Sequence, residues 1–145
     1  MQELPVVRLD PDLALPDYAR PGDAGLDLVA RVAVTVGPRG GRVLVATGIA
    51  VAIPDGYAGF VLPRSGNALR HGLTVANAPG LIDAGYRDEV KVILLNTDPT
   101  EPFEVRRGDR IAQLVVSAVE HVVLRSVDTL EASPRGLGGF GHSGR

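Results

Sequence analysis

The chain of 145 residues lacks cysteine and tryptophan, and no apolar run approaches the ~20 residues that a membrane-spanning helix needs. Without cysteine, disulfide frameworks, thiolate zinc sites and cysteine nucleophiles are excluded. The amino terminus also lacks a basic segment followed by an apolar stretch, which a secretory signal would have. We therefore expect a cytoplasmic protein with no membrane contact, and the length fits one domain of about 150 residues.

An excess of basic charge is absent as well, because 15 Lys and Arg stand against 17 Asp and Glu, a formal net charge of -2. Nucleic acid is therefore not an expected partner, since nothing provides a long-range basic field. Any anion-binding site must be local. Aromatic residues are scarce at 4%, and Lys91 is the sole lysine.

Glycine, proline and valine are abundant. The 18 glycines and 11 prolines favour a fold with many turns. Valine clusters in short segments separated by Gly, Pro or Asp, and strands do not alternate with helices, so the pattern predicts an all-β fold. The predicted strands are Val6–Leu9, Leu26–Val36 with a break, Arg42–Ile53, Tyr57–Leu62, Glu89–Asn96, Phe103–Val105 and Arg110–Leu124.

Three segments allow more detailed predictions. The valines of residues 32–36 alternate, which places them on one face of a half-buried strand. Residues 90–95 are apolar on both faces beyond Lys91, which predicts a place deep in a sandwich or at a subunit contact. One short helix is predicted over Ser65–Arg70, with the Ser65 hydroxyl suited to the N-cap.

The last segment, residues 133–145, has five glycines and almost nothing to bury. We expect a folded domain over residues 1–132 and a flexible C-terminal arm over residues 133–145. The arm carries Arg135, Phe140 and Ser143 among glycines that let a backbone approach a ligand, so it could close on a nucleotide. A disordered tail is an equal alternative on composition alone.

Two further segments could bind anions or perform acid–base chemistry. Arg64, Ser65 and Gly66 stand where a strand ends and the short helix begins, so backbone N–H groups, a hydroxyl and a guanidinium could converge on a phosphate. An ordinary N-cap beside a surface arginine is the alternative. Asp83 lies between apolar neighbours in a glycine-bounded turn, where partial desolvation could raise its basicity toward a general-base role. A plain turn residue is the alternative there.

Asp23 and Asp27 lie in a loop that enters a predicted strand. One of them could hold a hydrated Mg²⁺, because this ion takes one or two carboxylates together with substrate phosphates and water. The pair lacks the ligand spacing of an EF-hand, and a solvated turn is the alternative.

Taken in order, these segments resemble the five motifs of the trimeric dUTP diphosphatases, the dUTPases. Each motif is weak alone, but five in the same order are specific, and together they span nearly the whole chain. The matching motifs are Asp23–Leu28, Pro63–Gly66, Gly80–Glu89, Arg107–Leu114 and Arg135–Gly144.

The resemblance implies a jelly-roll-like β-barrel that assembles into a homotrimer. Three equivalent sites would lie at subunit interfaces, and the C-terminal arm of one subunit would close a site formed by the other two. The implied reaction is hydrolysis of dUTP to dUMP and pyrophosphate, which keeps uracil out of DNA and supplies dUMP for thymidylate synthesis.

The resemblance also implies roles for individual residues. Asp83 would orient and deprotonate the water that attacks the α-phosphorus. Mg²⁺ would clamp the triphosphate, with Asp27 holding it through water. The residues that would bind phosphates are Arg64, Ser65, Gly66, Gln113, Arg135 and Ser143.

For the nucleoside, Phe140 would stack on uracil, and Tyr86 would pack against the deoxyribose and leave no room for a 2′-hydroxyl. Base and sugar would also meet Asn77 and the turn through Leu81 and Ile82. Lys91 lies just beyond the third motif and could reach the ligand. A solvent-facing strand residue is the alternative for that lysine.

Two positions depart from the family pattern. Asp88 stands where the family has Gly, and Asp tolerates positive φ better than most residues. His142 replaces a Ser in the arm, which could make arm closure pH-dependent. Three other interpretations remain open: deamination of dCTP on the same fold, a nucleotide sensor without turnover, and a structural jelly-roll protein.

Overall fold

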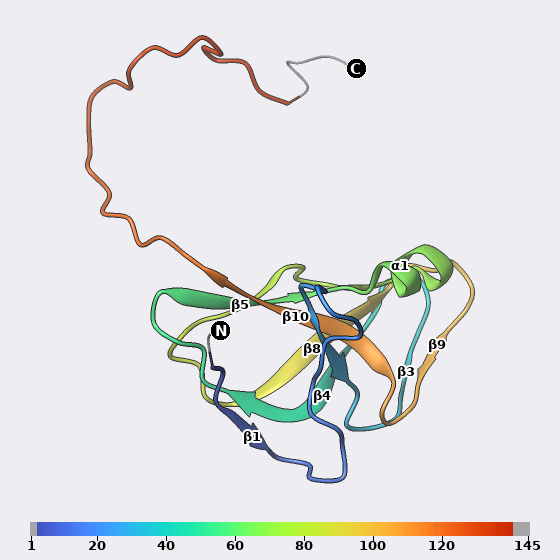
Figure 1. The fold of residues 1–145 in the computed structure, drawn as a ribbon. Coiled ribbons are helices and arrows are strands. Elements are labelled where there is room, and N and C mark those ends of the chain that lie inside the picture. Colours follow the sequence, from blue (N-terminus) through green and yellow to red (C-terminus); the bar gives the residue numbers. More distant parts are fainter. Residues whose placement is uncertain (1–2, 141–145) are drawn as a thin grey trace.

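The structure, a computed structural model, describes residues 3–140 and shows a β-rich domain with one short helix in that range (Figure 1). In chain order the elements are β1 (Val6–Arg8), β2 (Leu26–Val29), β3 (Val34–Val36), β4 (Gly41–Val51), β5 (Tyr57–Leu62), α1 (Ser65–His71), β6 (Leu73–Val75), β7 (Gly80–Ile82), β8 (Glu89–Asn96), β9 (Phe103–Val105) and β10 (Arg110–Ala118).

The strands form two four-stranded sheets, in the orders β1-β4-β8-β6 and β2-β10-β5-β7, and a two-stranded sheet of β3 and β9. Every pairing is antiparallel. The buried core draws on both larger sheets, for example Val45 and Val92 from one and Leu28 and Leu114 from the other. The sheets do not close into a complete barrel, but the predicted jelly-roll-like all-β fold is confirmed.

The longest strands follow the period-two pattern. In β8, Val90, Val92, Leu94 and Asn96 are buried, whereas Lys91 on the opposite face is exposed. The remaining apolar residues of that opposite face are half-buried in the single chain. Buried Asn96 is satisfied by the carbonyls of Val36 and Glu101, at 3.0 and 2.9 Å.

Several local predictions were wrong. β10 ends at Ala118 and not at Leu124, because the apolar residues beyond it find no pairing strand within one chain. Val32 lies in a bend outside any strand and is 50% exposed. The N-cap of α1 is Arg64, not Ser65, and no side chain caps that helix end.

The chain beyond β10 leaves the domain and extends away from both sheets (Figure 1). All residues from 120 to 137 are exposed, including Val123 at 96% and Leu124 at 91%. Local hydrogen bonds occur here, such as the 2.7 Å bond from Arg135 Nε to the Gly138 carbonyl. Within residues 3–140, no helix is long and apolar enough to cross a membrane.

Candidate active site

A polar pocket of about 210 Å³ gathers residues from three of the five motifs. Its lining residues are Ala19, Asp23, Gly25, Asp27, Arg64, Ser65, Gly66, Arg70, Arg110 and Gln113. Three arginines face two carboxylates, so the pocket carries an excess of guanidinium donors, and we call it the guanidinium-rich pocket. Such a set of donors, in a fixed fork geometry, suits phosphate oxygens.

The pocket exists because of strand register. In the second sheet, β10 lies between β2 and β5, and Gln113 pairs with both Asp27 and Leu62. This register places the first motif, the fourth motif and the end of β5 side by side. The second motif then follows β5 directly and begins α1, so its Arg64 and Ser65 enter the same pocket.

Asp27 organises two of the arginines. Its carboxylate lies 3.4 Å from Arg64 Nε through Oδ1 and 3.1 Å from Arg110 Nη1 through Oδ2. The Asp27 side chain is 19% exposed, so the pair is shielded more than a surface ion pair. The two guanidinium groups are therefore oriented before any ligand binds.

Gln113 and Gly25 fit closely together. The Gln113 Nε2 donates to the Pro63 carbonyl at 3.1 Å, which fixes the amide. A Cβ added at Gly25 would lie 2.6 Å from Gln113 Oε1 and 3.1 Å from its Cβ. Only glycine leaves room for Gln113 at this point.

Arg70 and Arg110 are pocket residues that the sequence prediction did not single out. Arg70 follows Gly66 by four positions on α1, and residues at this spacing share a helix face. A Cβ at Gly66 would lie 2.8 Å from Arg70 Nη2, so the guanidinium crosses over the glycine. The helix spacing could have identified Arg70, whereas Arg110 required the pairing of β10 with β2.

A second pocket, of about 170 Å³, is lined by residues of β7, of β8 and of the turn between them. It brings together five predicted residues: Asn77, Leu81, Ile82, Tyr86 and Lys91. The remaining lining residues are Val61, Val75, Gly80, Val90, Val92 and Ile93. Most of its lining side chains are apolar and a few are polar, as in many small-molecule sites, and we call it the apolar pocket.

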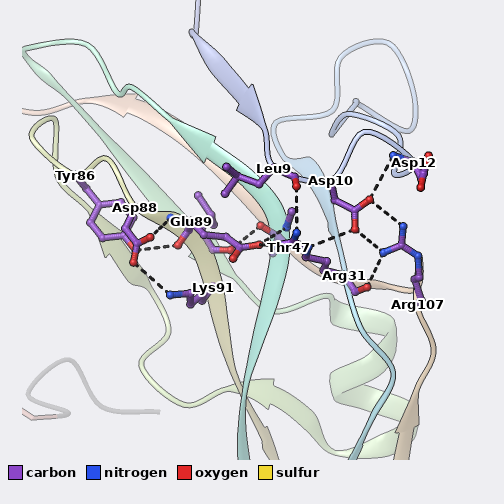
Figure 2. Close-up of polar contacts among 12 residues, drawn as sticks. Leu9, Asp10, Asp12, Arg31, Thr47, Tyr86, Asp88, Glu89, Lys91 and Arg107 are labelled. Atoms are coloured by element: carbon purple, nitrogen blue, oxygen red, sulfur yellow. Dashed lines mark hydrogen bonds and ion pairs between the residues drawn. The ribbon is translucent and has the colours of Figure 1, made fainter.

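The turn beside this second pocket is tied by side chains (Figure 2). Tyr86 Oη donates to the Glu89 carbonyl at 2.8 Å, and Lys91 Nζ lies 3.2 Å from Asp88 Oδ2. The Glu89 backbone N–H and the Lys91 ammonium lower the pKa of Asp88, and Asp88 in turn raises the pKa of Lys91.

Asp88 does not need the backbone freedom of the glycine it replaces. In the described chain, the non-glycine residues with positive φ are Arg39 and Phe140, so Asp88 has an ordinary backbone conformation. Its tolerance of positive φ is therefore not required here, and the side chain instead pairs with Lys91.

Asp83 is not part of either pocket. It follows β7 in a large open hollow that it shares with residues such as Asp55 and His121. Its side chain is exposed in the single chain, so the predicted partial desolvation is not found there. Arg135 and Phe140 are exposed on the extended segment, and Ser143 and His142 lie outside the described residues.

The guanidinium-rich pocket can hold a metal ion whose direct ligands are phosphate and water. Among residues 3–140, no group of three or more potential metal-binding side chains gathers. Both Asp27 oxygens face arginines, but a carboxylate offers about four lone-pair sites, which leaves room for a bridging water. The donor set therefore fits Mg²⁺ that takes its inner ligands from phosphate and water.

A β-sandwich that carries a guanidinium-rich pocket and a separate apolar pocket has an arrangement suited to a nucleotide-binding protein. Comparison with known proteins narrows this class. The dUTPase family model matches residues 12–144, and the chain belongs to the dUTPase family, whose members hydrolyse dUTP. The protein is therefore a hydrolase of nucleotide metabolism.

Two curated relatives are deoxyuridine 5'-triphosphate nucleotidohydrolases. The Thermobifida fusca (strain YX) protein is 63% identical over 137 residues, which cover 94% of this chain and 76% of the relative. The Rhodococcus erythropolis (strain PR4 / NBRC 100887) protein is 56% identical over 137 residues, with 94% and 83% covered.

Solved structures agree on the fold. The Staphylococcus bacteriophage 80alpha dUTPase with dUPNHPP superposes with a TM-score of 0.85 at 27% identity, covering 100% of both chains. A mutant dUTPase from phage phi11 of S. aureus, described with a structural Mg(II) ion, gives a TM-score of 0.82 at 24% identity. That match covers 90% of this chain and 100% of the phage chain.

Proposed function

We propose that the protein converts dUTP to dUMP and pyrophosphate by attack of water on the α-phosphorus, with Mg²⁺ bound to the triphosphate. The observation that carries this proposal is the register of β10, which gathers three motifs around one guanidinium-rich pocket. An apolar pocket for a nucleoside on the same domain supports it further.

The triphosphate binds in the guanidinium-rich pocket. Arg64, Ser65, Gly66 and Gln113 contact phosphate oxygens, and the position of Arg70 at the same pocket supports an equivalent role. Ion pairing with Asp27 holds two of the guanidinium groups in place before the nucleotide arrives. Preorganised donors of this kind stabilise charge without reorganising at the moment of reaction.

The nucleoside binds in the apolar pocket. Asn77 and the backbone at Leu81 and Ile82 meet the base, and Tyr86 packs against the sugar. A ribose would need space for its 2′-hydroxyl beside Tyr86, so the pocket favours deoxyribose. Lys91 lines the same pocket and is held at its edge by Asp88, which supports contact with the ligand.

The complete site requires more than one subunit. Asp83 lies outside both pockets, and apolar residues of the extended segment, such as Val123 and Leu124, are exposed in the single chain. A homotrimer would cover these residues and join Asp83 to the pockets of neighbouring subunits. The arm would then bring Phe140 over the base and Arg135, with Ser143, to the γ-phosphate.

Chemistry in this site begins at Asp83. Its carboxylate accepts a proton from the attacking water, whose oxygen forms the new bond to the α-phosphorus, and the bond to pyrophosphate breaks. Asp27 would hold Mg²⁺ through water, and the ion would neutralise phosphate charge when bound. We place the activity in the cytoplasm, where it removes dUTP before it enters DNA and yields dUMP for thymidylate synthesis.

Pyrophosphate release tests this proposal. The wild-type protein and Asp83→Asn are each assayed with dUTP, dCTP, dTTP and UTP, in Mg²⁺ or in EDTA, and sedimentation measures the oligomeric state. We expect turnover of dUTP alone, dependent on Mg²⁺, from a trimer. Tight dUTP binding without turnover in the wild type would contradict the proposal and indicate a nucleotide sensor.

A further inference from the structure

Arg31 lies in the bend between β2 and β3 and joins two distant parts of the chain (Figure 2). Its Nη1 lies 3.2 Å from Glu89 Oε1, and its Nε lies 3.3 Å from Asp10 Oδ2. Its Nη2 donates to the Leu9 carbonyl at 3.1 Å. The side chains of Glu89 and Asp10 are each only 12% exposed, so this arginine compensates two shielded carboxylates.

Glu89 in turn fills a break in the neighbouring strand. The ladder between β4 and β8 shifts register between Ala46 and Ala50, and this bulge leaves the Gly48 N–H free to donate to Glu89 Oε1 at 2.8 Å. Gly48 adopts φ +77, which glycine accepts without strain. The Glu89 side chain is therefore fixed by Arg31 on one side and by the bulge on the other.

The backbone of Glu89 is hydrogen-bonded to the turn beside the apolar pocket. Its carbonyl accepts the Tyr86 hydroxyl at 2.8 Å, and its N–H donates to Asp88 Oδ1 at 2.7 Å. One residue thus joins the charged cluster around Arg31 to the tyrosine of the pocket (Figure 2). Arg31 and Glu89 do not line the guanidinium-rich pocket or the apolar pocket in residues 3–140.

Arg31 is itself held by Arg107. The Arg107 guanidinium binds both Asp10 oxygens, at 2.6 and 2.9 Å, and also donates to the Arg31 carbonyl at 2.7 Å. This two-point contact fixes the loop that carries Asp10. Asp10, held in this way, fixes the Arg31 guanidinium in the position where it contacts Glu89.

We propose that the Arg31–Glu89 ion pair is a positioning device that holds Tyr86 in the pocket and thereby sets selection of the sugar. The proposal rests on the proposed function, in which Tyr86 packs against deoxyribose. Loss of Arg31 leaves the Glu89 carboxylate shielded without its cation. The carboxylate then moves toward water, the start of β8 shifts with it, and the Tyr86 hydroxyl loses its acceptor.

Steady-state kinetics with dUTP and UTP test the pair. We expect Arg31→Met to lower the ratio of kcat/KM for dUTP over UTP about tenfold, Arg31→Lys to restore part of it, and the isosteric Glu89→Gln to act in the same direction. In a double-mutant cycle, Arg31→Met should have little further effect on this ratio in the Tyr86→Phe background. Arg8→Met is the matched control, because Arg8 donates to the Leu13 carbonyl of the same loop at 2.7 Å but forms no hydrogen bond or ion pair with Glu89.

Amide exchange over residues 84–89 provides a readout that does not require turnover. Arg31→Met should speed exchange there, and Arg8→Met should not. The positioning role would be overturned if Arg31→Met lowered Tm but left two quantities as in the wild type. These are the ratio of kcat/KM for dUTP over UTP and the amide exchange over residues 84–89. A wild-type protein that fails to hydrolyse dUTP would contradict the proposed function instead, and exchange alone would then decide whether Arg31 orders the turn.

Discussion

The guanidinium-rich pocket and the turn that carries Asp83 differ in how much of each is complete within one chain. In the pocket, Arg64 and Arg110 are already fixed by Asp27, and Gln113 is fixed by Pro63. Asp83, by contrast, is exposed and lies outside both ligand pockets. The donors proposed to bind phosphate are therefore preformed in the single chain, whereas the proposed chemical step depends on assembly into a trimer.

Asp83→Asn should have the largest effect, because it should reduce turnover and leave dUTP binding intact. The amide keeps the shape of the side chain but cannot accept the proton of water, so turnover should fall about 10²- to 10⁴-fold. Binding should survive, seen as a dUTP-induced rise in Tm. Asp55→Asn is the control, because Asp55 borders the same hollow and should leave turnover unchanged. Equal turnover in Asp83→Asn and wild type would remove Asp83 from the mechanism.

Phe140→Ala should produce the next largest effect and test the arm. Stacking of a base on an aromatic side chain contributes about 1–3 kcal/mol, so KM for dUTP should rise roughly 5- to 150-fold. The Tm without nucleotide should not change, because the Phe140 side chain is exposed in the domain alone. Leu137→Ala alters an equally exposed residue of the same segment, and the stacking role would be refuted if it raised KM as much.

The fold was largely predictable where strands are long and where apolar and polar residues alternate along them. β5, β8 and β9 have the predicted bounds, because each shows a regular apolar pattern between turn residues. β6 and β7 were missed, since they lack the predicted turns on both sides that mark the equally short β9. The sequence also cannot show which apolar runs find a partner, so β10 was predicted six residues beyond its end at Ala118.

The site was predictable as a set of residues but not as a geometry. Motif order identified residues of both pockets but neither Arg70 nor Arg110, and the strand pairing that joins Asp27 to Gln113 became visible only in the fold. In the proposed trimer, neighbouring subunits would supply the desolvation expected for Asp83, and no pattern within one chain reveals them. Arg31 gave no signal, because its partner Glu89 lies 58 positions away.

Gly25→Ala should have a moderate effect. It would disturb the guanidinium-rich pocket and leave the turn that carries Asp83 unchanged. The new Cβ would lie 2.6 Å from Gln113 Oε1 and 3.1 Å from Gln113 Cβ, so Gln113 must move. Overpacking of this kind lowers the free energy of unfolding by about 1–3 kcal/mol, measured by denaturant titration. Binding of dUTP should also weaken. In Gly37→Ala, no atom lies within 4 Å of the new Cβ, so a comparable loss there would contradict the packing argument.

The smallest expected effect concerns the acid stability of the cluster around Asp10. The Arg107 guanidinium, helped by Arg31, holds the pKa of Asp10 at about 2, below its ordinary value of 3.8. The unfolded chain therefore binds more protons than the folded chain between these values. The stabilisation from Asp10 is complete above pH 3.8 and is lost as the pH falls toward 2.

Asp10→Asn should consequently lower Tm near pH 7, and its difference from wild type should shrink between about pH 4 and pH 2. The Arg107→Met background provides the control, because Asp10 there has lost the partner that depresses its pKa most, and the pH dependence of the difference should flatten. A difference that stayed constant down to pH 2 would show that the carboxylate contributes through packing and not through its charge. The Asp10–Arg107 contact would then be an ordinary surface pair, and Arg31 would need another explanation for its fixed position.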